Sequence, residues 1–253
     1  MDTTERRTPI RNSLRHGALA GLAGGAALAA VLLLAGESPL QRAIDLEPAG
    51  GEELITRSGQ RVGGVIAALL VGVALGLVFA VVATAVRHRL ADKAADPWRT
   101  SLRLAALAFV TFQLVPFLKY PPNPPGIGTS ESVGRRTVLY VSLLAWSVLA
   151  TWAGWRARRW LDRRQIPHQL AGPAAVLTVL ALILFALIAL PGGPSPDAVP
   201  ASVVWSFRLA SLGGWAAYWA VLAAVFGWLS TPAELRHTSH TNPASPDRVR
   251  ASD

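Results

Sequence analysis

The chain has 253 residues, of which 52% are hydrophobic and only 15% are charged. Soluble domains carry about 25% charged residues, so this chain cannot cover itself with a hydrated surface, and lipid is its expected solvent. The net charge is +9, but the basic residues lie in short blocks between apolar runs, which is typical of membrane topology and argues against nucleic-acid binding. Cysteine is absent and the single methionine is Met1, which excludes disulfides and metal sites built on sulfur.

Six apolar stretches follow one another along the chain, each close to the roughly 20 residues that cross a bilayer as a helix. They are Leu14–Ala35, Val62–Val86, Leu102–Leu118, Thr137–Trp155, Leu170–Leu190 and Ser202–Leu229. The third is short, and Pro116 near its end could kink it. Continuous apolar runs without two-residue alternation argue against strands. The sequence therefore predicts an all-α integral membrane bundle of about six transmembrane helices.

The lysines and arginines give an orientation. Most of the 24 lie before the first stretch, after the even-numbered stretches or in the C-terminal tail, whereas Arg42, Arg57, Arg61, Lys119, Arg135 and Arg136 fall on the other side. The positive-inside rule then places both termini in the cytoplasm of a multi-pass plasma-membrane protein. Residues 1–13 are expected to be a cytoplasmic segment, 14–230 the membrane domain and 231–253 a disordered cytoplasmic tail. Cleavage of the first stretch as a signal peptide is the alternative for the N-terminus.

Small residues recur every four positions on the first two stretches. Gly17, Gly21 and Gly25 lie on the first, and Gly72 and Gly76 on the second. This spacing lets helix backbones approach closely. We interpret these glycines as packing residues, in preference to a functional hinge.

The third stretch ends in the segment FLKYPPNPPGIG, residues Phe117–Gly128. Lys119 and Tyr120 are predicted to anchor it at the membrane interface. The prolines should stop the helix, because each lacks an N–H and restricts the residue before it. A stiff, extended segment at this position predicts a rigid outer cap over the mouth of the bundle.

Arg208 lies inside the sixth stretch, about two turns from its start. An intramembrane arginine is costly and usually faces the bundle interior, where it pairs with another group. Ser211 and Trp215 share its helical face and predict a buried polar stripe, and Glu37 is the nearest plausible carboxylate. An arginine that extends outward to the interface is the alternative.

These motifs resemble the CbtA family of predicted cobalt transporter subunits. The resemblance covers about Leu14 to Leu229 and is most specific in LVPFLKYPPNPPGIG, with GRRTVLY, WSFRLASLG and AGESPLQRAIDLE in support. It implies cobalt(II) as the transported ion and a small single-span CbtB-like partner. The residues that match the family pattern are Glu37, Arg42, Lys119, Tyr120, Pro121, Asn123, Pro124, Pro125, Arg136, Thr137, Tyr140, Phe207, Arg208 and Ser211.

Metal ligands are sparse on the predicted outer side. Cobalt(II) suits imidazole, carboxylate and water, but the five histidines, His16, His88, His168, His237 and His240, all lie on the predicted cytoplasmic side. The H-x-x-H pair of His237 and His240 is expected to be part of the polar tail. No acidic residue or histidine lies in the middle of a stretch, so no metal ligand is assigned and no bound cofactor is expected.

No catalytic motif is present: the sequence contains no G-x-S-x-G, Walker A or H-E-x-x-H pattern. The favoured interpretation is a non-enzymatic subunit of a cobalt uptake system. Alternatives are a membrane scaffold for a small metal-binding partner, and a transporter of another metal or of a metal chelate. The candidate residues for the transport pathway or outer mouth are Glu37, Arg42, Lys119, Tyr120, Asn123, Arg136, Arg208 and Ser211.

Overall fold

A computed structural model describes residues 3–44, 56–89, 96–124, 130–193 and 200–232. These residues form helices and connecting segments, and none of them is in a strand. The helices are α1 (Thr3–Val31), α2 (Glu37–Ile44), α3 (Arg57–Arg89), α4 (Pro97–Phe109), α5 (Val115–Lys119), α6 (Ser130–Arg163), α7 (His168–Ala189) and α8 (Ala201–Ser230). Two π-helical turns, η1 (Leu32–Gly36) and η2 (Val110–Leu114), join α1 to α2 and α4 to α5. The all-α prediction is confirmed.

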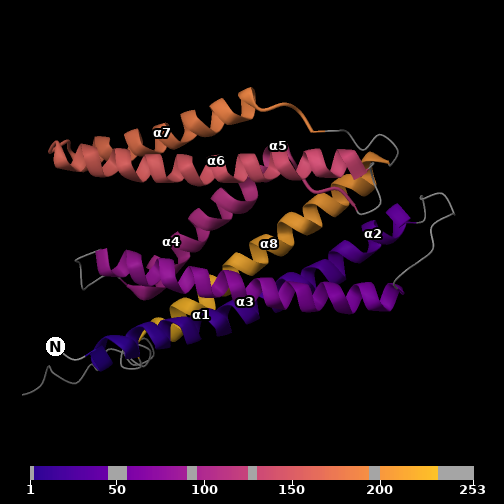
Figure 1. Cartoon of the computed structure of the whole chain (residues 1–253), viewed down its shortest axis with the longest axis horizontal. Coiled ribbons are helices and arrows are strands. Elements are labelled where there is room, and N and C mark those ends of the chain that lie inside the picture. The colour runs from indigo at the N-terminus through magenta and orange to yellow at the C-terminus, as the bar shows by residue number, and fades with distance from the viewer. Residues whose placement is uncertain (1–2, 45–55, 90–95, 125–129, 194–199, 233–253) are drawn as a thin grey trace, which may run out of the picture.

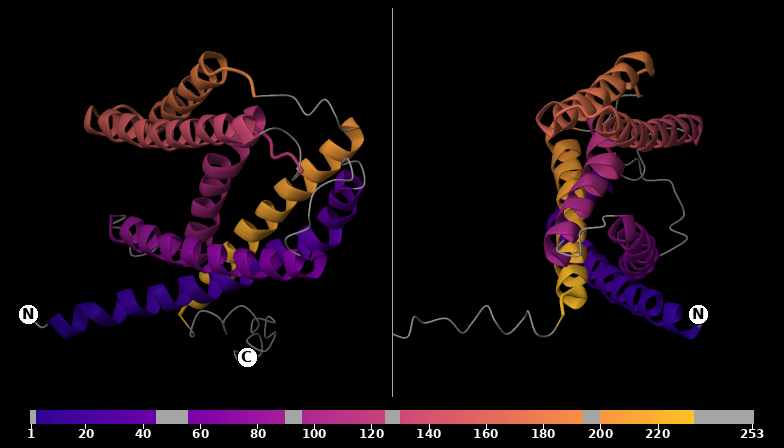
Figure 2. Two further views of the ribbon diagram at one scale, coloured as in Figure 1. Left: turned by 45° about the vertical axis from the view of Figure 1, so that its right-hand side comes forward. Right: turned by 90° about the vertical axis from the view of Figure 1, so that its left-hand side faces the viewer.

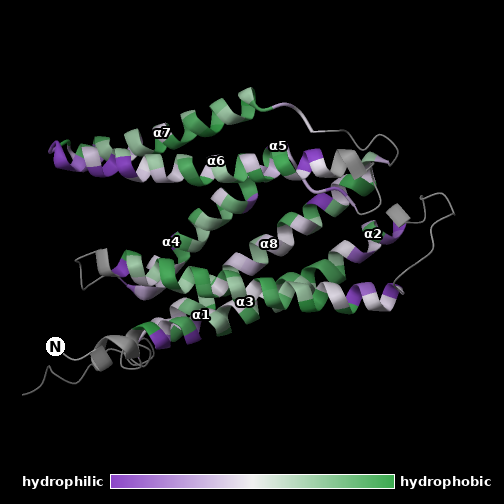
Figure 3. Cartoon of the chain, viewed as in Figure 1, coloured by the Kyte–Doolittle hydropathy of each residue, from purple (hydrophilic) through white to green (hydrophobic). Residues whose placement is uncertain are grey.

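Within the described residues, six helical segments are long and apolar enough to cross a membrane. They are Ile10–Arg42, Arg57–Arg87, Pro97–Lys119, Gly134–Arg163, His168–Ala189 and Ala201–Ser230. Hydrophobic residues fill the middle of the helices and hydrophilic residues gather toward several of their ends (Figure 3). The chain is therefore a six-helix membrane bundle, as predicted. Several helices are longer than the predicted stretches because hydropathy detects only their lipid-facing part.

The bundle has two parts (Figures 1 and 2). Helices α1, α3, α4 and α8 pack together, with α1 against both α3 and α8. Helices α6 and α7 form a hairpin to one side, and the third span, running from α4 through η2 to α5, connects the hairpin to the rest. Trp146 on α6 fastens the hairpin by donating its indole N–H to the carbonyl of Leu182 at 2.8 Å.

The α1–α3 interface consists of backbone packed on backbone. A Cβ atom added to Gly72 would lie 2.5 Å from the carbonyl oxygen of Gly21, and one added to Gly25 would lie 2.6 Å from that of Ala68. Such contacts are too short for any side chain, so only glycine fits. The interpretation of these glycines as packing residues agrees with this geometry.

Helix α8 supplies the largest side chains of the core. Tyr218, Leu222 and Phe226 are fully buried, and the Tyr218 hydroxyl donates to the carbonyl of Gly72 at 3.0 Å. Helix α1 contributes Ala20 and Leu28 to the same core. Removal of α1 as a signal peptide would therefore expose the packed faces of α3 and α8. The predicted tail falls almost entirely on residues 233–253, which lie outside the described part of the chain.

The third span contains a π-helical turn just before Pro116, the residue at which the sequence suggested a kink. The N–H of Val115 bonds to the carbonyl of Val110, which leaves the carbonyl of Thr111 without its usual helical partner. The Ser147 hydroxyl on α6 is fully buried and can donate its proton to this carbonyl at 2.7 Å or to that of Leu144 in its own helix at 2.8 Å. In a membrane, a freed backbone group has to find such a partner inside the protein.

Candidate functional site: a cavity beneath a proline strap

Residues 120–124, here called the strap, follow α5. The N–H of Tyr120 makes the last helical bond, to the carbonyl of Pro116 at 2.8 Å. Pro121, Pro122 and Pro124 have no N–H, so the helix cannot continue. The strap therefore presents mainly backbone carbonyl oxygens, which need hydrogen-bond donors from other parts of the protein. The prediction that the prolines end the helix is confirmed; residues 125–128 of the predicted cap lie outside the described part of the chain.

Lys119 and Tyr120 tie the start of the strap to the end of α7. The Lys119 ammonium donates to the carbonyl of Leu187, and the Tyr120 hydroxyl donates to that of Pro191 at 2.6 Å. Tyr120 is only 4% exposed, so its ring does not contact lipid as an interfacial anchor would, and it packs with Leu143 and Ala186 instead. Burial raises the pKa of the Tyr120 phenol above its ordinary value, which keeps the hydroxyl protonated and able to donate.

Two arginines hold the strap from opposite sides. Arg136 on α6 donates to the carbonyl of Pro121 at 2.7 Å. Arg208 on α8 donates to the carbonyl of Pro122 at 3.3 Å and to the Asn123 side-chain oxygen at 2.9 Å. The Arg208 guanidinium also lies 5.4 Å from the ring centre of Trp205. The hypothesis that Arg208 sits at the strap is therefore confirmed.

The predicted pairing of Arg208 with Glu37 is wrong. One oxygen of Glu37 accepts hydrogen bonds from Arg57 at 3.0 Å and from Arg61 at 2.6 Å. These arginines are one turn apart at the start of α3, and the close α1–α3 contact brings both to the end of the first span. Arg42 also lies apart from the strap, since it bonds to Ser38 within α2 and is exposed.

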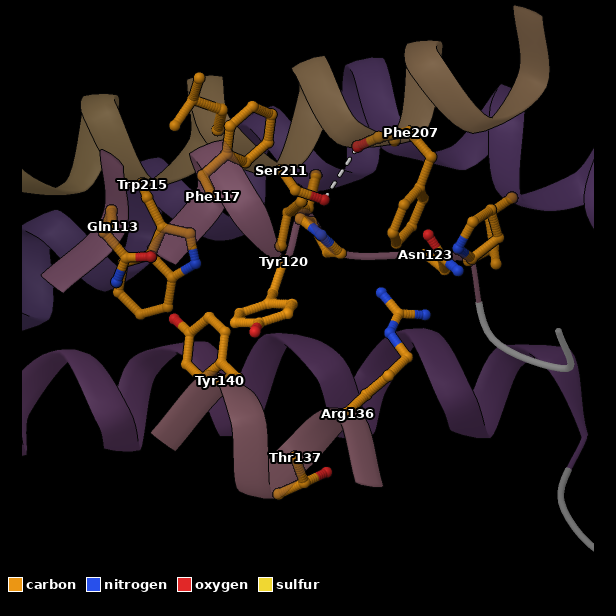
Figure 4. A pocket seen from close by; sticks show the side chains of 16 residues that line it. Gln113, Phe117, Tyr120, Asn123, Arg136, Thr137, Tyr140, Phe207, Ser211 and Trp215 are labelled. Carbon is orange, nitrogen blue, oxygen red and sulfur yellow. Dashed lines mark hydrogen bonds between the residues drawn. The ribbon is translucent and has the colours of Figure 1, made fainter. Parts of the chain in front are cut away.

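A cavity of about 710 Å³ lies beneath the strap (Figure 4). Its lining residues come from the first, third, fourth and sixth spans and from the strap: Leu32, Gly36, Leu40, Gln113, Phe117, Tyr120, Pro122, Asn123, Pro124, Arg136, Thr137, Tyr140, Phe207, Ser211, Leu212 and Trp215. Arg136 extends from α6 into the space between Tyr120 and Asn123 (Figure 4). A volume of this size falls within the usual range for small-molecule sites, about 300–1,000 Å³.

Four of the eight candidate residues line this cavity: Tyr120, Asn123, Arg136 and Ser211. Arg208 does not line the cavity but bonds to Asn123, which does. Lys119 does not line it either, and directly precedes the lining residue Tyr120. The predicted stripe of Ser211 and Trp215 also forms part of the wall. Gln113 was missed; an uncharged amide within an apolar span was the only sign of it.

The described residues offer no evident cation site. None of their histidines and carboxylates forms a group of three that could hold a metal ion, and the cavity lining includes no histidine, aspartate or glutamate. His237 and His240 lie outside the described residues. The cavity is instead lined by aromatic rings, hydroxyls, two amides and one guanidinium.

Comparison with known proteins gives the chain a family. No curated protein and no solved structure matches it. Residues 10–231 match the family described as "Probable cobalt transporter subunit (CbtA)". The match runs from the first span to the end of the sixth and includes every residue of the strap and cavity. The chain therefore belongs to the CbtA family of probable cobalt transporter subunits.

Proposed function

We propose that this protein is the multi-pass subunit through which cobalt is taken up across the plasma membrane. The observation that carries the proposal is the family match over residues 10–231, which takes in all six spans. The cavity beneath the strap is the natural entrance, since it is enclosed by four spans at one end of the bundle. A non-enzymatic role agrees with a family of transporter subunits.

The direction of uptake depends on which end of the bundle faces outward. The bias of lysines and arginines places the strap outside. Reporter fusions after Asp162 and Leu229 should then report the cytoplasm, and fusions near Gly50, Gly128 and Asp197 the exterior. An exterior signal at Asp162 would contradict this orientation.

A second candidate function is a membrane scaffold for a small metal-binding partner, such as a single-span CbtB-like subunit. Two observations favour it. The family is described as a subunit, and the described residues contain no cluster of three metal-ligating side chains. In that case the partner would supply the metal ligands.

Uptake of radioactive cobalt separates the two candidates. Cells expressing this chain alone, the partner alone, both or neither should be compared at equal protein level. Uptake by the chain alone would favour the transporter, and uptake that requires both would favour the scaffold. Equal cobalt in all four strains would contradict the proposed function.

A further inference from the structure

We infer that the cavity beneath the strap binds an organic anion, meaning a carboxylate or phosphate group attached to a partly apolar body. For a cobalt transporter, a ligand of this class is a negatively charged cobalt chelate; this step rests on the proposed function. An anionic phospholipid has the same chemistry, so the experiment below distinguishes the two sources.

The first argument is charge. Among the described residues, the hydrogen bonds of Arg136 and Arg208 to the strap go to two carbonyls and one side-chain amide, all of them neutral. The ion pairs found among the described residues join Glu37 to Arg57 and Arg61, Asp96 to Arg99, and Asp162 to Arg158. Hydrogen bonds to neutral groups do not cancel a charge near a membrane interior. An anion in the cavity would place a negative charge beside Arg136.

The second argument is the remaining hydrogen-bonding capacity of Arg136. A guanidinium has five N–H donors, and among the described residues Arg136 uses one nitrogen, for Pro121. The group points into the cavity between Tyr120 and Asn123 (Figure 4). Arginine matches the two oxygens of a carboxylate or phosphate with a pair of parallel donors. The remaining N–H groups of Arg136 can therefore bind the two oxygens of an anion in the cavity.

The third argument is the cavity wall. Phe207, Tyr140 and Trp215 present aromatic surface, while Gln113 and Ser211 add polar groups. Such a wall suits an organic body of small-molecule size. A bare divalent cation would find no carboxylate or imidazole there and would be repelled by Arg136. The same site would attract a chelate whose net charge is negative.

Binding should be measured on the purified full chain in nanodiscs, by following the midpoint of thermal unfolding. The probes are cobalt(II) citrate, cobalt(II) nitrilotriacetate, citrate alone and cobalt chloride. Each is tested in phosphatidylcholine discs and in discs that also contain phosphatidylglycerol. We expect either chelate to raise the midpoint in a saturable way, and cobalt chloride to have no effect.

The variants test the arginine directly. Arg136→Gln should weaken chelate binding by about tenfold to a hundredfold, the loss of one charge-assisted hydrogen-bonding group, and Arg136→Lys should restore part of it. Arg135→Gln is the matched control, because its exposed side chain is next in sequence and outside the cavity lining. Ser211→Asp keeps both arginines but adds a carboxylate to the wall, and it should abolish binding even if Arg136→Gln fails to fold.

The outcomes separate the possibilities. Stabilisation by a chelate that depends on Arg136 supports the inference with a soluble ligand. Arginine-dependent stabilisation by phosphatidylglycerol alone supports it with a lipid ligand. The inference is overturned if cobalt chloride stabilises the protein, or if neither a soluble organic anion nor phosphatidylglycerol does. If no organic anion stabilises the protein and cobalt uptake by cells in chelator-free medium is unchanged in Arg136→Gln, the inference is overturned while the proposed function stays intact.

Discussion

The α1–α3 interface and the segment from η2 through the strap, residues 110–124, meet the same demand in opposite ways. Both lie at contacts between helices in a bundle whose surroundings are apolar. At the glycines of the interface, the backbones of the two helices lie in direct contact with no room for a side chain between them. In residues 110–124 the helix is interrupted, and side chains from α6 and α8 bond to the freed carbonyls.

The difference shows where polar residues belong in such a protein. A regular helix satisfies its own backbone, so small residues suffice for packing. An irregular segment at membrane depth needs donors from neighbouring helices. Ser147, Arg136 and Arg208 are these donors, and they bond to Thr111, Pro121 and Pro122 in turn. Polar side chains thus support the irregular residues 110–124, and glycines allow the close packing of the regular helices α1 and α3.

The largest effect is expected where backbone packs on backbone. Gly72→Leu would drive a side chain into the carbonyl of Gly21, and neither backbone can yield. Overpacking costs about 1–3 kcal/mol in ordinary cores, and we expect at least about 3 kcal/mol here, seen as loss of the monodisperse peak in fluorescence-detected size-exclusion chromatography. Gly63→Leu on the same helix is the control, since a Cβ there meets nothing within 4 Å. Equal behaviour of the two variants would refute the packing argument.

A smaller effect is expected in the interrupted third span. Ser147→Ala would leave the carbonyl of Thr111 without its 2.7 Å hydrogen bond. We expect the free energy of unfolding to fall by about 1 kcal/mol, since a single membrane hydrogen bond contributes about 0.6–2 kcal/mol. Titration with a denaturing detergent measures it. Ser206→Ala, where an exposed hydroxyl bonds only within its own helix, should change little; a similar fall in both would remove the special role of Ser147.

The smallest effect concerns which arginine pairs with Glu37. A double-mutant cycle with Glu37→Gln and Arg61→Gln should give a coupling of about 0.2–1 kcal/mol, the usual range for a partly exposed pair. The cycle with Glu37→Gln and Arg208→Gln should be additive within about 0.5 kcal/mol. Stability is measured as in the preceding experiment. Stronger coupling to Arg208 would restore the contact that the structure rejects.

The sequence predicted the parts of the fold that depend on the solvent. The six spans, the end of the third helix at the prolines and the position of Arg208 at the strap all follow from hydropathy, proline chemistry and depth in the membrane. The partners of individual side chains could not be predicted in this way, because the depth of a residue in the membrane does not indicate which helices are neighbours. Glu37 pairs with Arg57 and Arg61 because α1 packs on α3, and Tyr120 is buried because α7 ends beside it.

The π-helical turn changes the direction in which the later side chains of the third span point around the helix axis. One extra residue in a turn rotates everything after it by about 100°, since an α-helix advances that much per residue. The contacts of Lys119 with Leu187 and of Tyr120 with Pro191 are made after this rotation. Deleting one residue from Val110–Leu114 would restore regular winding and aim both side chains away from α7. The turn therefore sets the direction in which Lys119 and Tyr120 point, and so fixes where the strap begins.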